Sequence, residues 1–306
     1  MQAVTRELFG LQNSMKVTLM SMSPMNEKVS RYSQGIFNSL AWVQEGDGLY
    51  ASARTTRAIW HIKNRSFKKI DDKYSSASNV RNWHLIYGLP RSSVLILAYS
   101  VETYLKAGLA KLFSRCDSAL LEAEFKKYGH NLKELASALE FPLDKESSGD
   151  LDEFKKYILH EARYPITPDI NQDYLNSYNK RNTAINDANK FKRLCSLARK
   201  IRAHSKKIDS DKTHPAYVTR LTIQPDGYIA VRVGGGLKTR ITYRASSTQI
   251  SKKHTSVSHI KIALRNHPEI YKLWRSAEVY EDTKNKGKRE ATLRKRRDSL
   301  QELSAN

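Results

Sequence analysis

Four polar residues have types and spacings that suit either an ion-pair cluster or a phosphate site. Glu102 and Lys106 are one helical turn apart in the apolar stretch "AYSVETYLKAGLAKL", His130 follows a glycine in "KYGHNL", and Arg163 opens "RYP". A glutamate and a lysine at this spacing pair along a helix, and a buried pair needs further partners because an unpaired buried charge is costly. We expect a structural polar cluster. The alternative is a nucleotide bound through Lys106 and Arg163.

The chain as a whole carries a large excess of positive charge. Its 306 residues include 53 Lys and Arg against 31 Asp and Glu, which gives a net charge of +22. An excess of this size indicates a polyanionic partner, most often nucleic acid, either RNA or DNA. The alternative is a cationic surface without a specific ligand.

Several other classes of chemistry are not indicated. The two cysteines, Cys116 and Cys195, lie far apart and match no CxxC spacing, which is typical of reduced thiols in a cytoplasmic protein. The nine histidines lack metal-ligand spacing, so we expect no metal site and no cofactor. No apolar run is long enough to span a membrane, and we expect no membrane partner.

The elements that must hold the polar cluster are expected to be helical. Apolar residues recur at i, i+3 and i+4 through 91–114, and Pro90 suits the first turn of that helix. Further helices are expected over 30–62 with a break at Gly46–Gly48, over 117–128, over 132–140, through Phe154 to "RYP", and over 170–206. A polar loop is expected over 63–83.

We expect residues 1–29 to lie outside the fold. They would be either a disordered segment or the product of a start codon assigned too early.

The character of the sequence changes after "KKIDSDKTHP" (206–215). Three short runs rich in Val, Ile, Thr and Tyr are separated by "DG" and "GGG", which predicts three antiparallel strands. A helix near 257–275 and a basic helix over 284–303 are expected to follow. The fold class is therefore α+β: an all-α helical bundle over 30–207, then a small basic domain of about three strands plus helices over 208–306.

Three segments of the bundle resemble motifs of a known superfamily. "ILAYSVETYLKAGLAKLF", "GHNLKELASAL" and "ARYP" occur in the order found in one branch of the HEPN superfamily, whose helical domains are common in prokaryotic toxin and phage-defence systems. The upstream "LYASARTT" is similar to the entry helix of that branch. The resemblance covers about 30–207. It implies a helical bundle, a homodimer and, for a toxin, a partner antitoxin.

The same resemblance implies a catalytic pair. Active branches of the superfamily use Arg-x(4–6)-His on one helix, paired across a dimer, to cleave RNA without metal, and Arg199 and His204 match that spacing. Imidazole can transfer the proton of the 2′-hydroxyl, and guanidinium can stabilise the charged phosphorane. A chain with 53 basic residues also produces this spacing by chance, and both residue types suit the C-terminal end of a helix.

The C-terminal part has a fainter resemblance. "VTRL", "GYIAVRV", "RITYRAS" and "GKREATLRKRRDSL" are similar to the three-strand-plus-helix DNA-binding fold of plant ethylene-response factors and integrase-type proteins. The resemblance implies a sheet that enters the major groove, where arginine reads guanine. The basic helix is expected to contact the nucleic-acid backbone. The implied nucleic-acid-binding residues are Arg220, Arg232, Arg240, Tyr243 and Arg244 on the sheet, and Lys288, Arg289, Arg294 and Arg297 on the helix.

Two functions stay open at this point. The first is a nucleic-acid-associated protein of toxin or phage-defence type that cleaves RNA as a metal-independent endoribonuclease, or binds it. The second is a non-catalytic DNA-binding regulator whose helical bundle dimerises. Ribonuclease activity needs His204 near Arg199 in a cleft shared by two subunits, whereas a regulator needs only the basic sheet. The alternative for the C-terminal part is a small α+β domain that is basic for solubility or for RNA contact.

Overall fold

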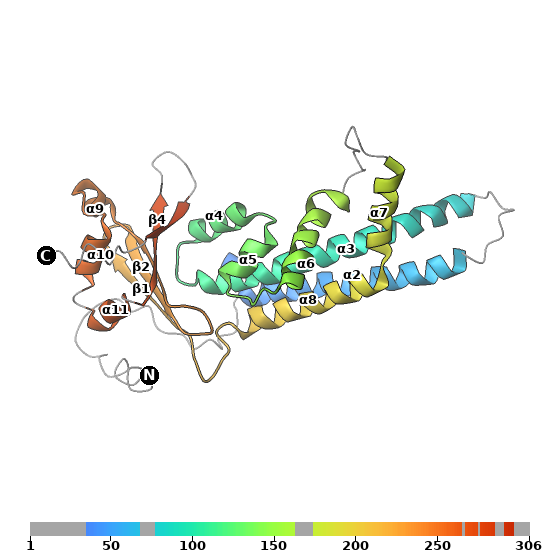
Figure 1. The fold of residues 1–306 in the computed structure, drawn as a ribbon. Helices are drawn as coiled ribbons and strands as arrows, with labels where there is room; N and C mark the ends of the chain where they lie inside the picture. Colours follow the sequence, from blue (N-terminus) through green and yellow to red (C-terminus); the bar gives the residue numbers. More distant parts are fainter. Residues whose placement is uncertain are drawn as a thin grey trace.

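The computed structural model describes residues 35–67, 77–162, 174–264, 267–274, 276–284 and 291–296. Within these ranges a helical bundle is followed by a five-stranded sheet that carries three short helices, so the predicted α+β class is confirmed (Figure 1). The sheet lies at one end of the bundle, where the chain passes from the last bundle helix into the first strand.

Two long helices form the axis of the bundle. After a short turn, η1 (Gly35–Phe37), α2 (Ser39–Phe67) runs away from the sheet and α3 (Ala77–Leu112) returns beside it (Figure 1). The predicted apolar stripe of α3 is the core of the bundle, because Leu97, Val101 and Leu105 are completely buried. The remaining bundle elements are α4 (Ser118–Tyr128), α5 (Leu132–Ala138), α6 (Lys145–Lys156), η2 (Tyr157–Glu161), α7 (Tyr174–Asn186) and α8 (Ala188–Lys207).

The predicted break at Gly46–Gly48 is wrong, because α2 runs through both glycines. A Cβ atom added at Gly46 would lie 2.5 Å from Cε1 of Tyr104 on α3. Gly46 therefore allows α2 to approach α3 closely. A helix interior tolerates glycine at a cost of about 1 kcal/mol, which such packing can offset.

The predicted helix start at Pro90 and most of the predicted polar loop are also wrong. The first helix extends to Phe67, and α3 begins at Ala77 and continues through Pro90. Proline has no N–H, so the carbonyl of Ile86, four residues earlier, receives no helical hydrogen bond from it. The indole Nε1 of Trp60 on α2 donates to that carbonyl at 3.1 Å. A neighbouring helix thus satisfies the group that proline leaves open.

The expected helix over 170–206 is two helices, because the chain turns at Asp187. Its Oδ1 accepts hydrogen bonds from the backbone N–H groups of Asn189 and Lys190, which caps the start of α8. The preceding helix α7 ends at Asn186, and the buried Arg57 of α2 donates to its last carbonyls, at 2.8 Å to Ile185 and 2.9 Å to Asn186.

The three predicted strands are confirmed as an antiparallel meander: β1 (Tyr217–Ile223), β2 (Gly227–Val233) and β3 (Arg240–Arg244). Two further strands extend the sheet: β4 (Glu278–Lys284) pairs parallel to β3, and β5 (Ala291–Arg296) pairs antiparallel to β4. The prediction of a basic helix over 284–303 is therefore wrong for 291–296, which form β5. The predicted helix near 257–275 is two short helices, α10 (Val257–Ala263) and α11 (Pro268–Leu273), which follow α9 (Ser247–Ser251).

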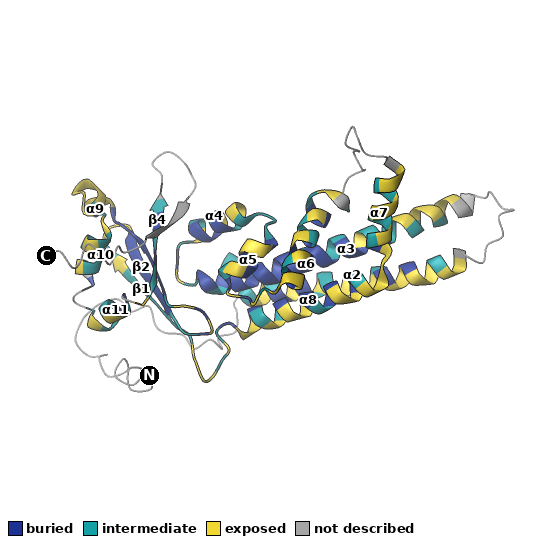
Figure 2. Ribbon diagram, viewed as in Figure 1, coloured by how far each residue is buried: buried dark blue, intermediate teal, exposed yellow. Residues whose placement is uncertain are grey.

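The two faces of the sheet have different partners (Figure 2). One face forms a second core, in which strand residues such as Ile229 and Ile241 pack with Ile260 of α10 and with Trp274. The opposite face carries polar and charged residues and packs against the end of the bundle, as the contacts of Arg240 with Phe113 illustrate. The sheet therefore has its apolar core on the side that faces away from the bundle.

Candidate nucleic-acid interface

The structure brings together three of the four residues of the predicted polar cluster. Glu102 is 5 % exposed, and its Oε1 accepts from Lys106 Nζ at 2.6 Å. Its Oε2 lies 2.9 Å from Nδ1 of His130, in the turn between α4 and α5. Both carboxylate oxygens are therefore engaged, which suits a role in holding α3 against that turn. The fourth residue, Arg163, lies outside the described residues.

Arg199 and His204 both lie on α8 but point to different sides of it. Five residues correspond to about 140° around a helix with 3.6 residues per turn. Nε2 of His204 lies 2.8 Å from the carbonyl of Leu139, and a carbonyl can only accept, so Nε2 carries the proton. His204 and Lys200 line an open depression of about 720 Å³ beside the loop after α5. Arg199 is exposed and does not line it. Within one chain the pair is not assembled.

Four of the sheet residues predicted to contact DNA are buried in this structure. Arg232, Arg240 and Arg244 are only 3 %, 8 % and 8 % exposed, and Tyr243 is completely buried in the core on the opposite face. The guanidinium of Arg240 lies between two rings, 4.5 Å from the centroid of Phe113 and 3.8 Å from that of Tyr280. The expectation that these four residues face a DNA groove is therefore corrected: Arg232, Arg240 and Arg244 hold the sheet on the bundle, and Tyr243 packs in the core of the sheet.

The structure describes two of the other predicted nucleic-acid-binding residues, Arg220 and Arg294. Arg220 of β1 is exposed, but it donates to the carbonyl of Arg115 at 3.0 Å and lies over the ring of Tyr228 at 4.2 Å. Arg294 is in β5, where its backbone lies opposite that of Glu281 in β4. Lys288, Arg289 and Arg297 lie outside the described residues.

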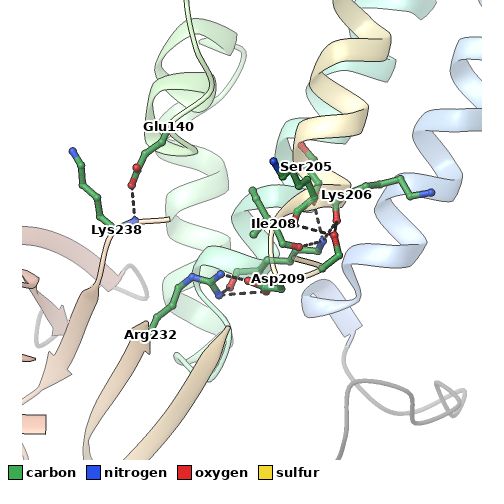
Figure 3. A network of polar contacts seen from close by, with 10 residues as sticks. Glu140, Ser205, Lys206, Ile208, Asp209, Arg232 and Lys238 are labelled. Carbon is green, nitrogen blue, oxygen red and sulfur yellow. Dashed lines mark hydrogen bonds and ion pairs between the residues drawn. The ribbon is translucent and has the colours of Figure 1, made fainter. Parts of the chain in front are cut away.

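One polar network at the end of α8 joins the bundle to the sheet (Figure 3). Nζ of Lys111 donates to the carbonyls of Ser205 at 2.9 Å and Ile208 at 2.6 Å, which satisfies the C-terminal end of that helix. Arg232 of β2 forms a buried ion pair with Asp209 and donates to the carbonyl of Lys111 at 3.0 Å. Burial lowers the pKa of Lys111.

A second network at this junction was not predicted from the sequence. The side chain of Asp282 on β4 is fully buried, accepts from the hydroxyl of Tyr228 at 2.7 Å and pairs with Arg244 at 2.6 Å. The same guanidinium reaches Asp117, the N-cap of α4, at 2.5 Å. Burial raises the pKa of Asp282, against the opposing effects of Tyr228 and Arg244. The sequence signal was weak, because Asp282 sits in an ordinary polar stretch, "YEDTK".

Exposed cations lie along α2 and α8, two helices that contact each other through Asp47 and Arg202 and run side by side (Figure 1). Every charged side chain of α8 is lysine or arginine, and α2 has no acidic residue after Asp47. Burial, followed by repulsion from Arg57, Arg65 and Lys192, lowers the pKa of His61. We define the α2–α8 cationic face by five exposed residues: Arg54, His61, Arg65, Lys192 and Arg199.

Three cations of α8 form ion pairs with carboxylates of the bundle, so they are not counted in this face. Arg202 pairs with Asp47, Arg193 with Asp150, and Lys190 with Glu153. By contrast, no ion pair to Lys192 or Arg199 is present among the described residues. Unpaired exposed cations on two adjacent helices can hold successive phosphates. The absence of acidic residues from α8 is visible in the sequence and could have indicated this face.

Comparison of the chain with protein-family models, with curated proteins and with solved structures finds no match. Among the helices that the structure describes, none combines the length and the apolar character needed to cross a membrane.

Proposed function

We propose that this protein binds nucleic acid, and that the α2–α8 cationic face holds the phosphate backbone. The observation that carries the proposal is the set of exposed cations on two adjacent helices, Arg54 and Arg65 on α2 and Lys192 and Arg199 on α8, for which the described residues show no ion pair. The 20 residues of α8 span about 30 Å, a little less than one turn of B-DNA, which is long enough for several phosphate contacts. The net charge of +22 and the resemblance to HEPN domains add support.

The test compares two variants that have the same net charge. Arg65, Lys192 and Arg199 are changed to glutamine in one variant, and the exposed lysines Lys212, Lys252 and Lys253 of the sheet region in the other. Fluorescence anisotropy of a labelled oligonucleotide is measured from 50 to 200 mM salt. We expect the first variant to bind more weakly and to lose roughly one unit of salt slope per contact removed.

The control variant shows whether binding depends on a defined face or on the overall charge. It should bind almost as the unchanged protein does, because its lysines are not among the residues of the α2–α8 cationic face. An equal loss of affinity in both variants would mean that the overall charge attracts the oligonucleotide without a defined face. An unchanged protein that binds no oligonucleotide at low salt would refute nucleic-acid binding altogether.

Metal-independent endoribonuclease activity is the second candidate. It is favoured by the position of His204 at an open depression that Lys200 also lines, since an imidazole and an ammonium there could act on one phosphodiester. Total RNA is incubated with EDTA at low salt, with the unchanged protein and with His204→Ala and Lys200→Ala. Cleavage that both substitutions abolish, with oligonucleotide binding retained in His204→Ala, supports catalysis. Intact RNA with the unchanged protein leaves binding alone.

A further inference from the structure

The distal part of α3 carries an exposed aromatic stripe. Trp83 is 47 % exposed, Tyr87 is 41 % exposed, and Val80, one turn before Trp83, is 58 % exposed. These residues are three and four apart, so they lie on one side of the helix. Single exposed apolar residues are ordinary on a protein surface, but several large ones on the same side mark an interaction site.

The two rings of this stripe are stacked. Their centroids are 5.4 Å apart and their planes differ by 13°. Near-parallel aromatic rings can be extended by a further flat π-system, and every nucleobase has such a face. Both residues are close to the start of α3 at Ala77, which is the end of that helix farther from the sheet (Figure 1). Both rings are partly exposed to solvent. A ligand can therefore approach them from solvent.

The charge around the stripe indicates the kind of ligand. Arg81 precedes the aromatic pair, His84 lies between the two rings in sequence, and Arg91 follows one turn after Tyr87. The described part of α3 contains no acidic residue before Glu102, and the facing part of α2 adds Lys63 and Arg65. A second copy of this chain would bring the same positive charges to the contact. A polyanion with exposed flat groups complements both the charge and the rings.

We propose that the stripe of Val80, Trp83 and Tyr87 stacks with unpaired bases of single-stranded nucleic acid, while the flanking arginines hold the phosphates. Base faces are accessible in single strands and covered in a duplex, so exposed rings contribute to binding of single strands. The inference rests on the proposed function and deepens it: the α2–α8 cationic face attracts the backbone without distinguishing strands, and the stripe supplies the preference for single strands.

The experiment uses the full chain and two labelled probes, a 15-nucleotide oligo(dT) and a duplex of equal length. The test variant is Trp83→Ala combined with Tyr87→Ala. Because both residues are more than two fifths exposed and belong to neither described core, the fold should tolerate the loss of their side chains. The control is Ile262→Ala, which removes another exposed apolar side chain from the sheet region, where Ile262 is 52 % exposed. Trp83→Phe keeps an aromatic ring and serves as the rescue variant.

We expect the double variant to bind oligo(dT) about 5- to 100-fold more weakly and the duplex almost unchanged. Ile262→Ala and Trp83→Phe should bind within roughly threefold of the unchanged protein. Trp83 is the most exposed of the four tryptophans, since Trp60 and Trp274 are buried and Trp42 is half-buried. Oligo(dT) should therefore quench the intrinsic fluorescence of the unchanged protein, and the double variant should lose most of that quenching.

Three results would overturn the inference. If the double variant and the unchanged protein bind oligo(dT) with equal affinity, the stripe does not contribute to binding. The cationic face and the proposed function would be unaffected by that result. Equal weakening of oligo(dT) and duplex binding would make the stripe part of a general binding surface. A change from dimer to monomer in sedimentation caused by the double substitution would identify the stripe as a contact between copies. No binding of either probe by the unchanged protein would instead refute the proposed function.

Discussion

Arg244→Met should strongly destabilise the junction between sheet and bundle. The guanidinium of Arg244 is shared by two carboxylates, Asp117 at the start of α4 and Asp282 in β4. Methionine preserves much of the apolar stem but removes the charge. The side chain of Asp282 is fully buried. Without Arg244, the hydroxyl of Tyr228 would still donate a hydrogen bond to its carboxylate, but the neighbouring positive charge would be lost. Leaving a buried charge without its partner costs about 3–5 kcal/mol.

The size of this loss should depend on pH in a defined direction. Burial already raises the pKa of Asp282, and removal of the neighbouring cation should raise it further. A carboxyl group whose folded pKa lies above its unfolded value of 3.8 is better accommodated when protonated, so it destabilises increasingly as pH rises through the folded pKa. Arg244→Met should therefore lose more stability at pH 8 than at pH 5.

Urea unfolding followed by circular dichroism and tryptophan fluorescence measures this loss. Adding Asp282→Asn to Arg244→Met should recover part of it and abolish the difference between pH 5 and pH 8. Lys252→Met, at an exposed position of α9's C-terminal end, is the control and should change stability by less than about 0.5 kcal/mol. A loss below about 1 kcal/mol for Arg244→Met, equal at both pH values, would refute the argument that its charge is needed at a buried site.

Two further predictions concern α2. Gly46→Ala should lower the free energy of unfolding by about 1–3 kcal/mol, because the added Cβ would meet the ring of Tyr104. Gly48→Ala, where the added Cβ meets nothing, should raise it by about 0.5–1 kcal/mol. Thermal unfolding compares the two variants. The hydrogen bond from Arg202 lowers the pKa of Asp47, so the pair contributes stability above pH 3.8 that is lost as pH falls through the folded pKa. Arg202→Gln should cost about 1 kcal/mol or less at pH 7, because the pair is partly exposed, and the difference from the unchanged protein should vanish in acid titration.

The parts of the fold that were predictable from the sequence are those set by local periodicity. The buried stripe of α3 and the three strands of the meander follow from repeats of 3.6 and 2 residues. Pro90 and Gly46 were misinterpreted because their partners, Trp60 and Tyr104, are distant in sequence. Local rules give the usual effect of proline or glycine, and a tertiary contact can reverse it.

The candidate site shows the same division between local and tertiary information. Strand alternation places Arg240 and Arg244 on one face of β3, and the structure agrees. Alternation does not say whether that face meets solvent or another domain. The sequence predicts a basic helix over 284–303, yet 291–296 form a strand that pairs with β4. Edge pairing depends on a neighbour that the segment itself does not encode.

The use of arginine inside the junction also directs the search for a ligand surface. Arg232, Arg240 and Arg244 meet carboxylates, carbonyls or rings and keep little exposed area for a ligand. The proposed polyanion would therefore be bound by other cations, such as the exposed Arg65, Lys192 and Arg199 of the bundle. The cationic face includes α2, and the stripe lies on α3, which packs against α2. Because the buried Arg57 ties α2 to the end of α7, α2 is fixed in place before any ligand arrives, which lowers the entropic cost of binding.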